Sequence, residues 1–284
     1  MPAVPVRVLD RLVDSLKRFQ PILASAKARD AGEADTSTIV KDALAEVFGY
    51  DKYTEITSEY LIKGTYCDLA IKLDGKLVVL IEVKAIGLEL KYGHTKQAVD
   101  YAANQGVEWV VLTNGAFWRV YRVIFAQPIA QEIVYEWDML SLNPKNRAQV
   151  ENLFLLAKEG HSKSVLHDFH AQRQATSRYL LAAVILSDAV LEVARRELRR
   201  AFPDVRIETG ELREAMIQDV LKREVTEGDR ADEARKRLGR AQGKVLRARS
   251  KAAAAAAGAA TGFPPLSEGA ESDPMEAVNP ELGT

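Results

Sequence analysis

Three charged residues interrupt two apolar, strand-like segments of the sequence. Asp68 lies in the first segment, and Glu82 and Lys84 lie near the end of the second. Both segments are rich in aliphatic and β-branched residues, and an Asp-Gly turn signal separates them, so together they predict a β-hairpin. Because burying an ionised group without a partner is costly, each carboxylate must lie at an exposed edge, form an ion pair or bind a metal.

Strand geometry decides whether the three charged side chains share one face of the sheet. Side chains alternate along a strand, so Glu82 and Lys84 point to the same face, about 6.8 Å apart. A simple two-residue loop at 74–75 would pair Asp68 with Ile81 and place Asp68 on the opposite face. The sequence therefore predicts a three-residue loop with its glycine in the left-handed region, or a bulge, that shifts the register by one.

Further polar residues lie on the elements predicted around this hairpin. Glu46, in the last turn of a predicted helix, is either a solvated carboxylate or an additional acid that reaches the site. Glu59 is either an edge-strand residue facing water or a carboxylate that supports the site. His94, Gln97 and Tyr101 follow helical spacing, so these polar groups face a common surface.

The elements that would position these residues include both helices and strands. Apolar residues at helical spacing predict an amphipathic helix over 6–29, and Asp35, Thr36 and Ser37 offer N-caps for a helix over 38–48. An Asn-Gly hairpin signal follows at 114–115. The predicted strands cover 53–62, 67–73, 77–84, 107–113, 117–124 and 131–136, with a helix over 91–104 between the third and the fourth.

The chain becomes helical after about residue 145 and then loses its apolar pattern. Beyond residue 228 it is rich in Arg, Lys and Ala, and then in Gly, Pro, Ser and Glu, which predicts a segment that cannot bury enough apolar surface to become ordered. We expect an α/β domain over 1–140, a helical region over 141–227 and a disordered tail over 228–284. The predicted helices of the middle region cover 145–158, 163–174, 176–201 and 209–225.

Composition places the chain among globular proteins. It has 284 residues, of which 47% are hydrophobic and 28% charged, with a net charge of -1 and a single cysteine, so an internal disulfide is excluded. The absence of a long apolar run and of a signal-like N-terminus favours a cytoplasmic protein that does not enter a membrane. The near-neutral total hides an asymmetry, because 235–251 has basic residues without acidic ones and 252–284 has only acidic charges.

The order of the elements, together with the charged strand residues, resembles the PD-(D/E)XK nuclease superfamily. More narrowly, residues 37–123 resemble the N-terminal nuclease domain of type I restriction enzyme R subunits. Cys67 stands where the superfamily has its name-giving proline. The resemblance implies a mixed sheet flanked by helices. The motifs that carry it are Glu59-Tyr60, Asp68-Leu69-Ala70, Val79-Leu80-Ile81-Glu82-Val83-Lys84-Ala85, Val110-Val111-Leu112-Thr113-Asn114-Gly115 and a QxxxY pair at Gln97 and Tyr101.

The resemblance also assigns roles to the strand residues. Asp68 and Glu82 would be catalytic ligands of Mg2+, with Mn2+ as a substitute, because hard carboxylate oxygens suit these cations. Lys84 would hold the nucleophilic water and stabilise hydroxide, and Gln97 would orient Lys84 or a phosphate oxygen. Tyr101 would support the helix packing or contact the DNA backbone.

Three candidates remain from the flanking elements. We include Glu46 among the catalytic candidates, and we include Glu59 and His94, with the tyrosine of the QxxxY pair, among residues that bind DNA or support the site. Basic clusters outside the core are ordinary solvated helix faces unless DNA is the substrate, in which case they become backbone contacts. These clusters are Arg195, Arg196, Arg199 and Arg200, and the segment 235–251.

The leading prediction is a Mg2+-dependent DNA endonuclease of restriction type that hydrolyses phosphodiester bonds with a metal-activated water. Its partners would be DNA and other restriction-system subunits, and a homodimer is compatible with the sequence. The alternative is a nuclease-fold subunit that binds DNA or assembles a restriction or defence complex without cutting. A weaker alternative is a scaffold in which the helical region is the functional part.

Overall fold

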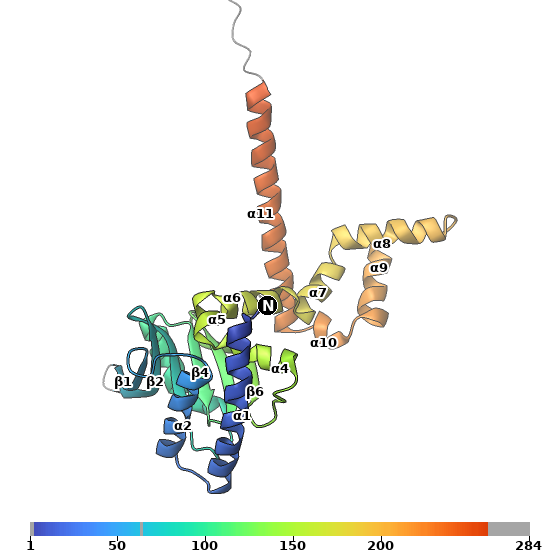
Figure 1. The fold of residues 1–284 in the computed structure, drawn as a ribbon. Coiled ribbons are helices and arrows are strands. Elements are labelled where there is room, and N and C mark those ends of the chain that lie inside the picture. Colours follow the sequence, from blue (N-terminus) through green and yellow to red (C-terminus); the bar gives the residue numbers. More distant parts are fainter. Residues whose placement is uncertain (1–2, 63–64, 261–284) are drawn as a thin grey trace, which may run out of the picture. The chain divides into compact units, whose positions relative to one another are not determined.

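The computed structural model describes residues 3–62 and 65–260, which fall into two compact units. The first unit runs to Gln174 and the second begins at Ala175. The first unit combines a β-sheet with helices and contains every residue of the candidate site, whereas the described part of the second unit is helical (Figure 1). Among the described helices, none has the length and apolar character needed to cross a membrane.

A mixed sheet of six strands, in the order β1-β2-β3-β4-β5-β6, forms the centre of the first unit. Only β3 and β4 run parallel, and the helix between them supplies the crossover that a parallel pair requires. The expected α/β class with a mixed sheet is therefore confirmed. The strands are β1 (Ile56–Ile62), β2 (Thr65–Leu73), β3 (Lys76–Val83), β4 (Trp109–Thr113), β5 (Phe117–Ile124) and β6 (Ala130–Asp138).

Two apolar cores lie on the two faces of this sheet. The larger core includes the buried stripes of α1 (Val6–Ala28) and α2 (Glu33–Glu46), and the smaller core includes the buried residues of α3 (Lys96–Gln105). The amphipathic spacing of α1 explains its packing, because Leu12, Leu16 and Leu23 recur on one side of the helix and are fully or almost fully buried.

The start of α2 differs from the prediction of a helix over 38–48. The helix begins at Glu33, one turn earlier, with Gly32 at its N-cap. Thr36 does not cap the helix: its buried hydroxyl donates to the carbonyl of Gly32 and accepts a 3.1 Å hydrogen bond from the backbone N–H of Ile86. This contact ties the first turn of α2 to the chain just beyond β3.

Short helices complete the first unit. The structure divides the predicted helix over 145–158, because turns of different type follow one another there. The elements are η1 (Tyr92–Thr95) before α3, and then α4 (Arg147–Glu151), η2 (Asn152–Leu155), α5 (Lys158–Ser162) and α6 (Val165–Ala175), the last of which ends at the boundary between the units.

The second unit contains a long helix where the sequence favours disorder. This helix, α11 (Asp229–Ala260), is rich in Ala, Arg and Lys, which are strong helix formers, and its Ala231 and Ala234 are buried within the unit. Residues 261–284 lie outside the described residues. The remaining elements are α7 (Arg178–Ile185), α8 (Asp188–Ala201), α9 (Thr209–Ala215), the π-helix η3 (Met216–Val220) and α10 (Arg223–Thr226), so the predicted helix over 176–201 is broken at Leu186 and Ser187.

Candidate active site

The turn between β2 and β3 has two residues. Leu73 pairs with Lys76, and the intervening Asp74 and Gly75 have φ values of 49° and 76°. Two consecutive left-handed residues are typical of the tight turns that match the twist of a hairpin. The three-residue loop offered by the sequence is therefore wrong, and the left-handed conformation of the glycine is confirmed.

A bulge in β3 supplies the register shift instead. Lys72 pairs with Leu77, but the next residue of β2, Ile71, pairs with Val79, so Val78 is the extra residue. A bulge of this kind reverses the alternation of side chains on one strand relative to its partner. The bulged hairpin predicted as the second option is confirmed.

The bulge brings the two carboxylate positions to one face of the sheet. Leu69 pairs with Ile81, and both belong to the larger core on the face covered by α1 and α2. Continuation of this register sets Asp68 opposite Glu82, on the other face. Without the extra residue Asp68 would lie opposite Ile81, on the wrong face for a shared site.

The sheet splits at the same level. Pairing between β2 and β3 ends at Ile81, whereas β3 continues beside β4 and pairs Val83 with Thr113. The N–H of Val83 donates a 2.7 Å hydrogen bond to Oδ2 of Asp68. The carboxylate thus takes the place of a strand carbonyl, which satisfies the peptide of β3 and fixes the position of Asp68.

Lys84 lies at the centre of an acidic cluster. Its Nζ is 2.8 Å from Oε1 of Glu82 and 3.5 Å from Oε1 of Glu33, and its side chain is only 17% exposed. Its backbone N–H donates a 2.8 Å hydrogen bond to the carbonyl of Thr113, so β4 holds the end of β3 in place. Carboxylates from two different elements therefore hold this ammonium group.

Glu33 was not among the predicted site residues. With a predicted helix start at residue 38, Glu33 would lie in a loop, whereas in the structure it lies in the first turn of α2, where the helix dipole favours acidic side chains. The available signal was the Gly32-Glu33 pair before a helical apolar pattern, since glycine is also an accepted N-cap residue.

Burial and charge shift the pKa values of the three strand residues upward. Burial, the largest cause, raises the pKa of Asp68 and of Glu82 above the ordinary values, and the charge of Asp68 raises the pKa of Glu82 further. Burial alone would lower the pKa of Lys84, but the hydrogen bond to Glu82 and the negative charges of Glu82, Glu33 and Asp68 raise it. The cluster therefore favours a protonated lysine and disfavours further negative charge.

These properties fit a divalent cation. Two half-buried to buried carboxylates on one face carry an electrostatic cost that a bound cation would relieve, and their hard oxygens suit Mg2+. In the described part of the chain, no group of three or more His, Cys, Asp or Glu side chains is arranged to hold a metal. Asp68 and Glu82 would accordingly need water or phosphate oxygens to complete the coordination, which is the usual condition of Mg2+.

The polar stripe of α3 lies on the helix of the smaller core, which also includes Leu80 and Ala70 of the site face. Gln97 is exposed, and its amide donates a 2.7 Å hydrogen bond to the hydroxyl of Tyr101. His94 instead accepts a 3.1 Å hydrogen bond at Nδ1 from the N–H of Lys91, which caps η1. The helix thus packs on the same face of the sheet as the site, and His94 has a local structural role.

Among the described residues, Glu46 and Glu59 have no ion pair with Lys84, and they differ in their distance from the cluster. Glu46 ends α2, about 20 Å along the helix from Glu33, and forms a 2.5 Å ion pair with Arg18. Glu59 is exposed on β1 at the position that faces Asp68 in the register, and its φ of 49° interrupts the pairing there. Glu46 therefore lies away from the acidic cluster, in an ion pair with Arg18. Glu59 lies on the strand next to Asp68 and so is close to the cluster in the sheet.

Cys67 departs from the face that strict alternation predicts. It is fully buried in the smaller core rather than with Leu69, beside the interruption of β1 at Glu59. Burial is the main cause that raises the pKa of its thiol to about 12. The thiol next to Asp68 is therefore inert as a nucleophile at neutral pH.

Comparison with known families identifies one match. Residues 39–134 match the family model described as Type I restriction enzyme R protein N terminus, which confirms the expected resemblance over this segment. The matched segment contains Asp68, Glu82 and Lys84 and excludes Glu33. Searches of curated proteins and of solved structures gave no match.

Proposed function

From the match of residues 39–134 to the R protein N terminus and from the geometry of the site, we propose that the first unit is a Mg2+-dependent DNA endonuclease of restriction type with a PD-(D/E)XK core. One observation carries the proposal. Lys84 Nζ lies 2.8 Å from Glu82, and the β3 bulge sets Asp68 opposite Glu82 on the same face. An ordinary surface ion pair would need neither the bulge nor a second, half-buried carboxylate.

A divalent cation held by Asp68 and Glu82 would supply charge neutralisation and a more acidic water for phosphodiester hydrolysis. The chain's own groups then have distinct tasks. Asp68 is held by the N–H of Val83, so its free oxygen keeps a fixed direction. The hydrogen bond from Lys84 to Glu82 lowers the pKa of this carboxyl and so opposes the larger, upward effect of its burial.

Lys84 would position the attacking water. An ammonium group on the site face donates hydrogen bonds to a water or hydroxide oxygen and opposes the charge that develops on the phosphate. Glu33 forms an ion pair with the same ammonium group at 3.5 Å and limits the rotation of the lysine side chain. Glu33 is thus a positioning residue in this proposal, because it acts through Lys84.

The amide of Gln97 would contact the substrate. The residue is exposed on α3, the helix that packs on the site face of the sheet, and its hydrogen bond with Tyr101 holds it along the helix. An amide can donate to a phosphate oxygen of the scissile strand. Tyr101 then maintains this orientation rather than taking part in proton transfer.

A plasmid assay tests the proposal. We expect purified protein to convert supercoiled DNA into nicked and linear forms in Mg2+ and to leave it intact in EDTA. Cleavage that continues in EDTA would contradict the proposed chemistry. The same assay on linear double-stranded and single-stranded DNA defines which substrate is cut.

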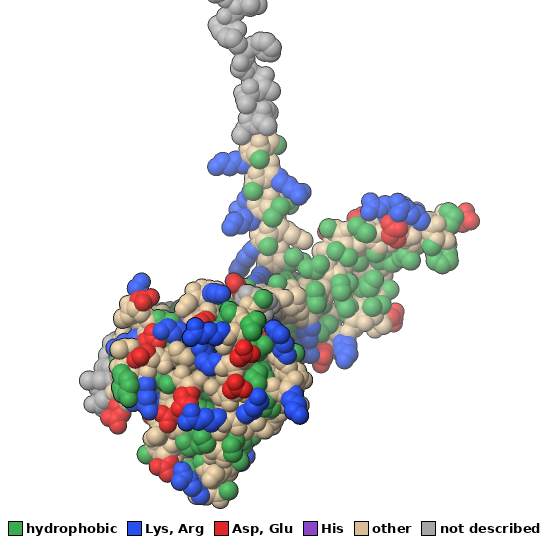
Figure 2. Space-filling view, viewed as in Figure 1, with side chains coloured by type: hydrophobic (Ala, Val, Ile, Leu, Met, Phe, Trp, Pro, Cys, Tyr) green, Lys and Arg blue, Asp and Glu red, His purple; other side chains and the backbone are tan. Residues whose placement is uncertain are grey.

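A subunit that binds DNA or assembles a complex without cutting is the second candidate. Two observations favour it: Glu82 and Asp68 already have protein hydrogen-bond partners, and the helical unit exposes apolar side chains, many of them visible as green patches in Figure 2. Retained DNA binding without cleavage in Mg2+ or Mn2+ would favour this function. The exposed apolar side chains include Leu181, Val193, Phe202 and Val220.

A further inference from the structure

Positive charge on α11 is concentrated on one side of the helix. From residue 235 to 251 the sequence contains only basic charges. With 3.6 residues per turn, six of these side chains fall within an arc of roughly 100°, and they extend about 22 Å along the axis. This basic stripe consists of Lys236, Arg237, Arg240, Lys244, Arg247 and Lys251, all of which are exposed.

From Arg240 onward, the basic stripe is not neutralised by its own helix. The acidic residues of α11, Asp229, Asp232 and Glu233, all lie in its first turns, before the stripe begins. In the part of the chain that the structure describes, no ion pair holds Arg240, Lys244 or Arg247. On the side drawn in Figure 2, α11 carries Lys and Arg side chains and no acidic ones beyond its base.

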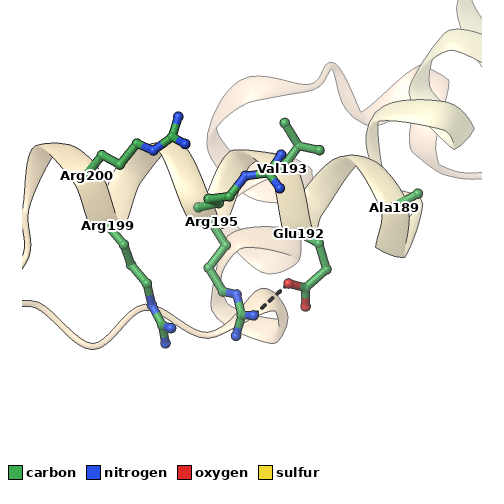
Figure 3. A pocket seen from close by; sticks show the side chains of 7 residues that line it. Ala189, Glu192, Val193, Arg195, Arg199 and Arg200 are labelled. Carbon is green, nitrogen blue, oxygen red and sulfur yellow. Dashed lines mark hydrogen bonds and ion pairs between the residues drawn. The ribbon is translucent and has the colours of Figure 1, made fainter.

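The arginines of α8 differ in this respect. They line a pocket with Glu192, and Figure 3 shows Arg195 paired with that carboxylate at 2.6 Å. Arg200 pairs with Glu197 at 2.8 Å. Much of the positive charge on α8 is therefore already offset by carboxylates of the same helix.

The opposite side of α11 limits the kind of partner. Ala231 and Ala234 are buried within the unit, and farther along the helix only Val245 and Leu246 are large exposed apolar residues. A helix that lies in a membrane interface needs a broad apolar face next to its basic residues. The basic stripe has no such neighbour, so its chemistry suits a soluble polyanion better than a lipid surface.

We propose that the basic stripe of α11 binds the phosphate backbone of double-stranded DNA without reading its sequence. Duplex DNA presents one negative charge per about 1.7 Å of its axis, so a rigid helix with cations along about 22 Å can contact several phosphates at once. A flexible single strand would lose more conformational freedom to follow a straight row of cations. This inference goes beyond the proposed function, since a chain that does not cut DNA could still bind it in this way.

Binding of a labelled 20-base-pair duplex in EDTA, followed by fluorescence anisotropy, tests the inference without cleavage. The full chain with Arg240→Gln, Lys244→Gln and Arg247→Gln is compared with the wild-type chain. We expect the affinity at about 0.1 M salt to fall at least tenfold. We also expect the negative slope of log K against log salt to become shallower by roughly 3, because each phosphate contact contributes about -0.9 to it.

A matched control removes the same number of charges from α8. The variant with Arg196→Gln, Arg199→Gln and Arg200→Gln should bind within about twofold of the wild-type chain, and circular dichroism should show equal helix content for both variants. Equal losses in the two variants, or no loss in the α11 variant, would overturn the assignment. Equal or tighter binding of a single strand, or binding of the wild-type chain to anionic vesicles but not to the duplex, would overturn it as well.

Discussion

The backbone N–H of Val83 donates a 2.7 Å hydrogen bond to Oδ2 of Asp68, at the level where β2 and β3 separate. Through this bond, the side chain of Asp68 on β2 accepts from the peptide of β3 where a strand carbonyl would otherwise accept. It holds a carboxylate beside Glu82 on a face that the β3 bulge makes common to both. The site is therefore a consequence of how the hairpin ends as well as of which residues it contains.

Asp68→Asn should remove the response of the protein to Mg2+ without weakening its fold. The amide oxygen can still accept from Val83, while the burial cost of the charge disappears. In EDTA we expect an equal or higher Tm than the wild type has, and we expect no Mg2+-dependent increase in Tm by calorimetry. Asp100→Asn, at an exposed position of α3, should retain the increase.

The raised pKa values of Asp68 and Glu82 predict how the stability of the metal-free protein depends on pH. Because the folded-state pKa values of Asp68 and Glu82 are raised, their contribution is fully present below the unfolded values of about 4 and is lost as the pH rises through the folded values. The double variant Asp68→Asn, Glu82→Gln should remove this loss from the dependence of the unfolding free energy on pH. If the unfolding free energy of the wild type, relative to that of the double variant, instead increased as the pH rises above about 4, the burial argument would be contradicted.

Glu33→Gln should impair cleavage with little effect on stability. The ion pair with Lys84 spans 3.5 Å and Glu33 is 52% exposed, so its loss should lower the free energy of unfolding by less than about 1 kcal/mol. Since the charge of Glu33 helps raise the pKa of Lys84, the alkaline limb of the rate profile should move to lower pH. Asp35→Asn, two residues along α2, should leave the profile unchanged, and an unshifted profile for Glu33→Gln would exclude the positioning role.

Gly75→Ala should destabilise the first unit through the backbone alone. Gly75 has a φ of 76° with no atom within 4 Å of an added Cβ, so the cost is that of left-handed backbone, about 1 to 2 kcal/mol. Gly93→Ala is the matched control, because the space around Gly93 is also open and its φ is not positive. Urea unfolding of the two variants should show a lower midpoint for Gly75→Ala, and equal midpoints would contradict the turn geometry.

Cys67 offers a chemical probe of the strand that carries Asp68. Its thiol is fully buried and has a pKa raised to about 12, so the native protein should not react with DTNB at pH 8 on a scale of minutes. One thiol should react at once in concentrated urea. Rapid reaction of the native protein would show that β2 opens readily beside the site.

Local chemistry explains why most of the strands and the register of the hairpin were predictable. The period-two pattern and the Asp-Gly turn identify β2 and β3, and the demand that three charges share a face predicts the shift that Val78 provides. The bulge itself was one of two solutions that the pattern allowed. In the structure Val78, the extra residue of the bulge, packs against the larger core, a tertiary contact that the local pattern does not reveal.

The helical position of Glu33 and the helix α11 could not be predicted from local sequence patterns. The hydroxyl of Thr36 serves a tertiary contact with Ile86 rather than an N-cap, and this contact starts α2 one turn before the position that the capping residues indicate. In α11, helix propensity and the burial of Ala231 and Ala234 outweigh a composition typical of disorder. Both differences arise from tertiary contacts that local sequence patterns do not reveal.

The role of Lys84 gives the most direct test of the central claim. Cleavage of supercoiled plasmid in Mg2+ should fall at least a hundredfold in Lys84→Ala, because the water-positioning ammonium group is lost. Lys76→Ala, at the exposed start of β3, should cut at the wild-type rate. Equal thermal stability of the two variants would separate chemistry from folding. Cleavage by Lys84→Ala at the rate of the wild type would contradict the account.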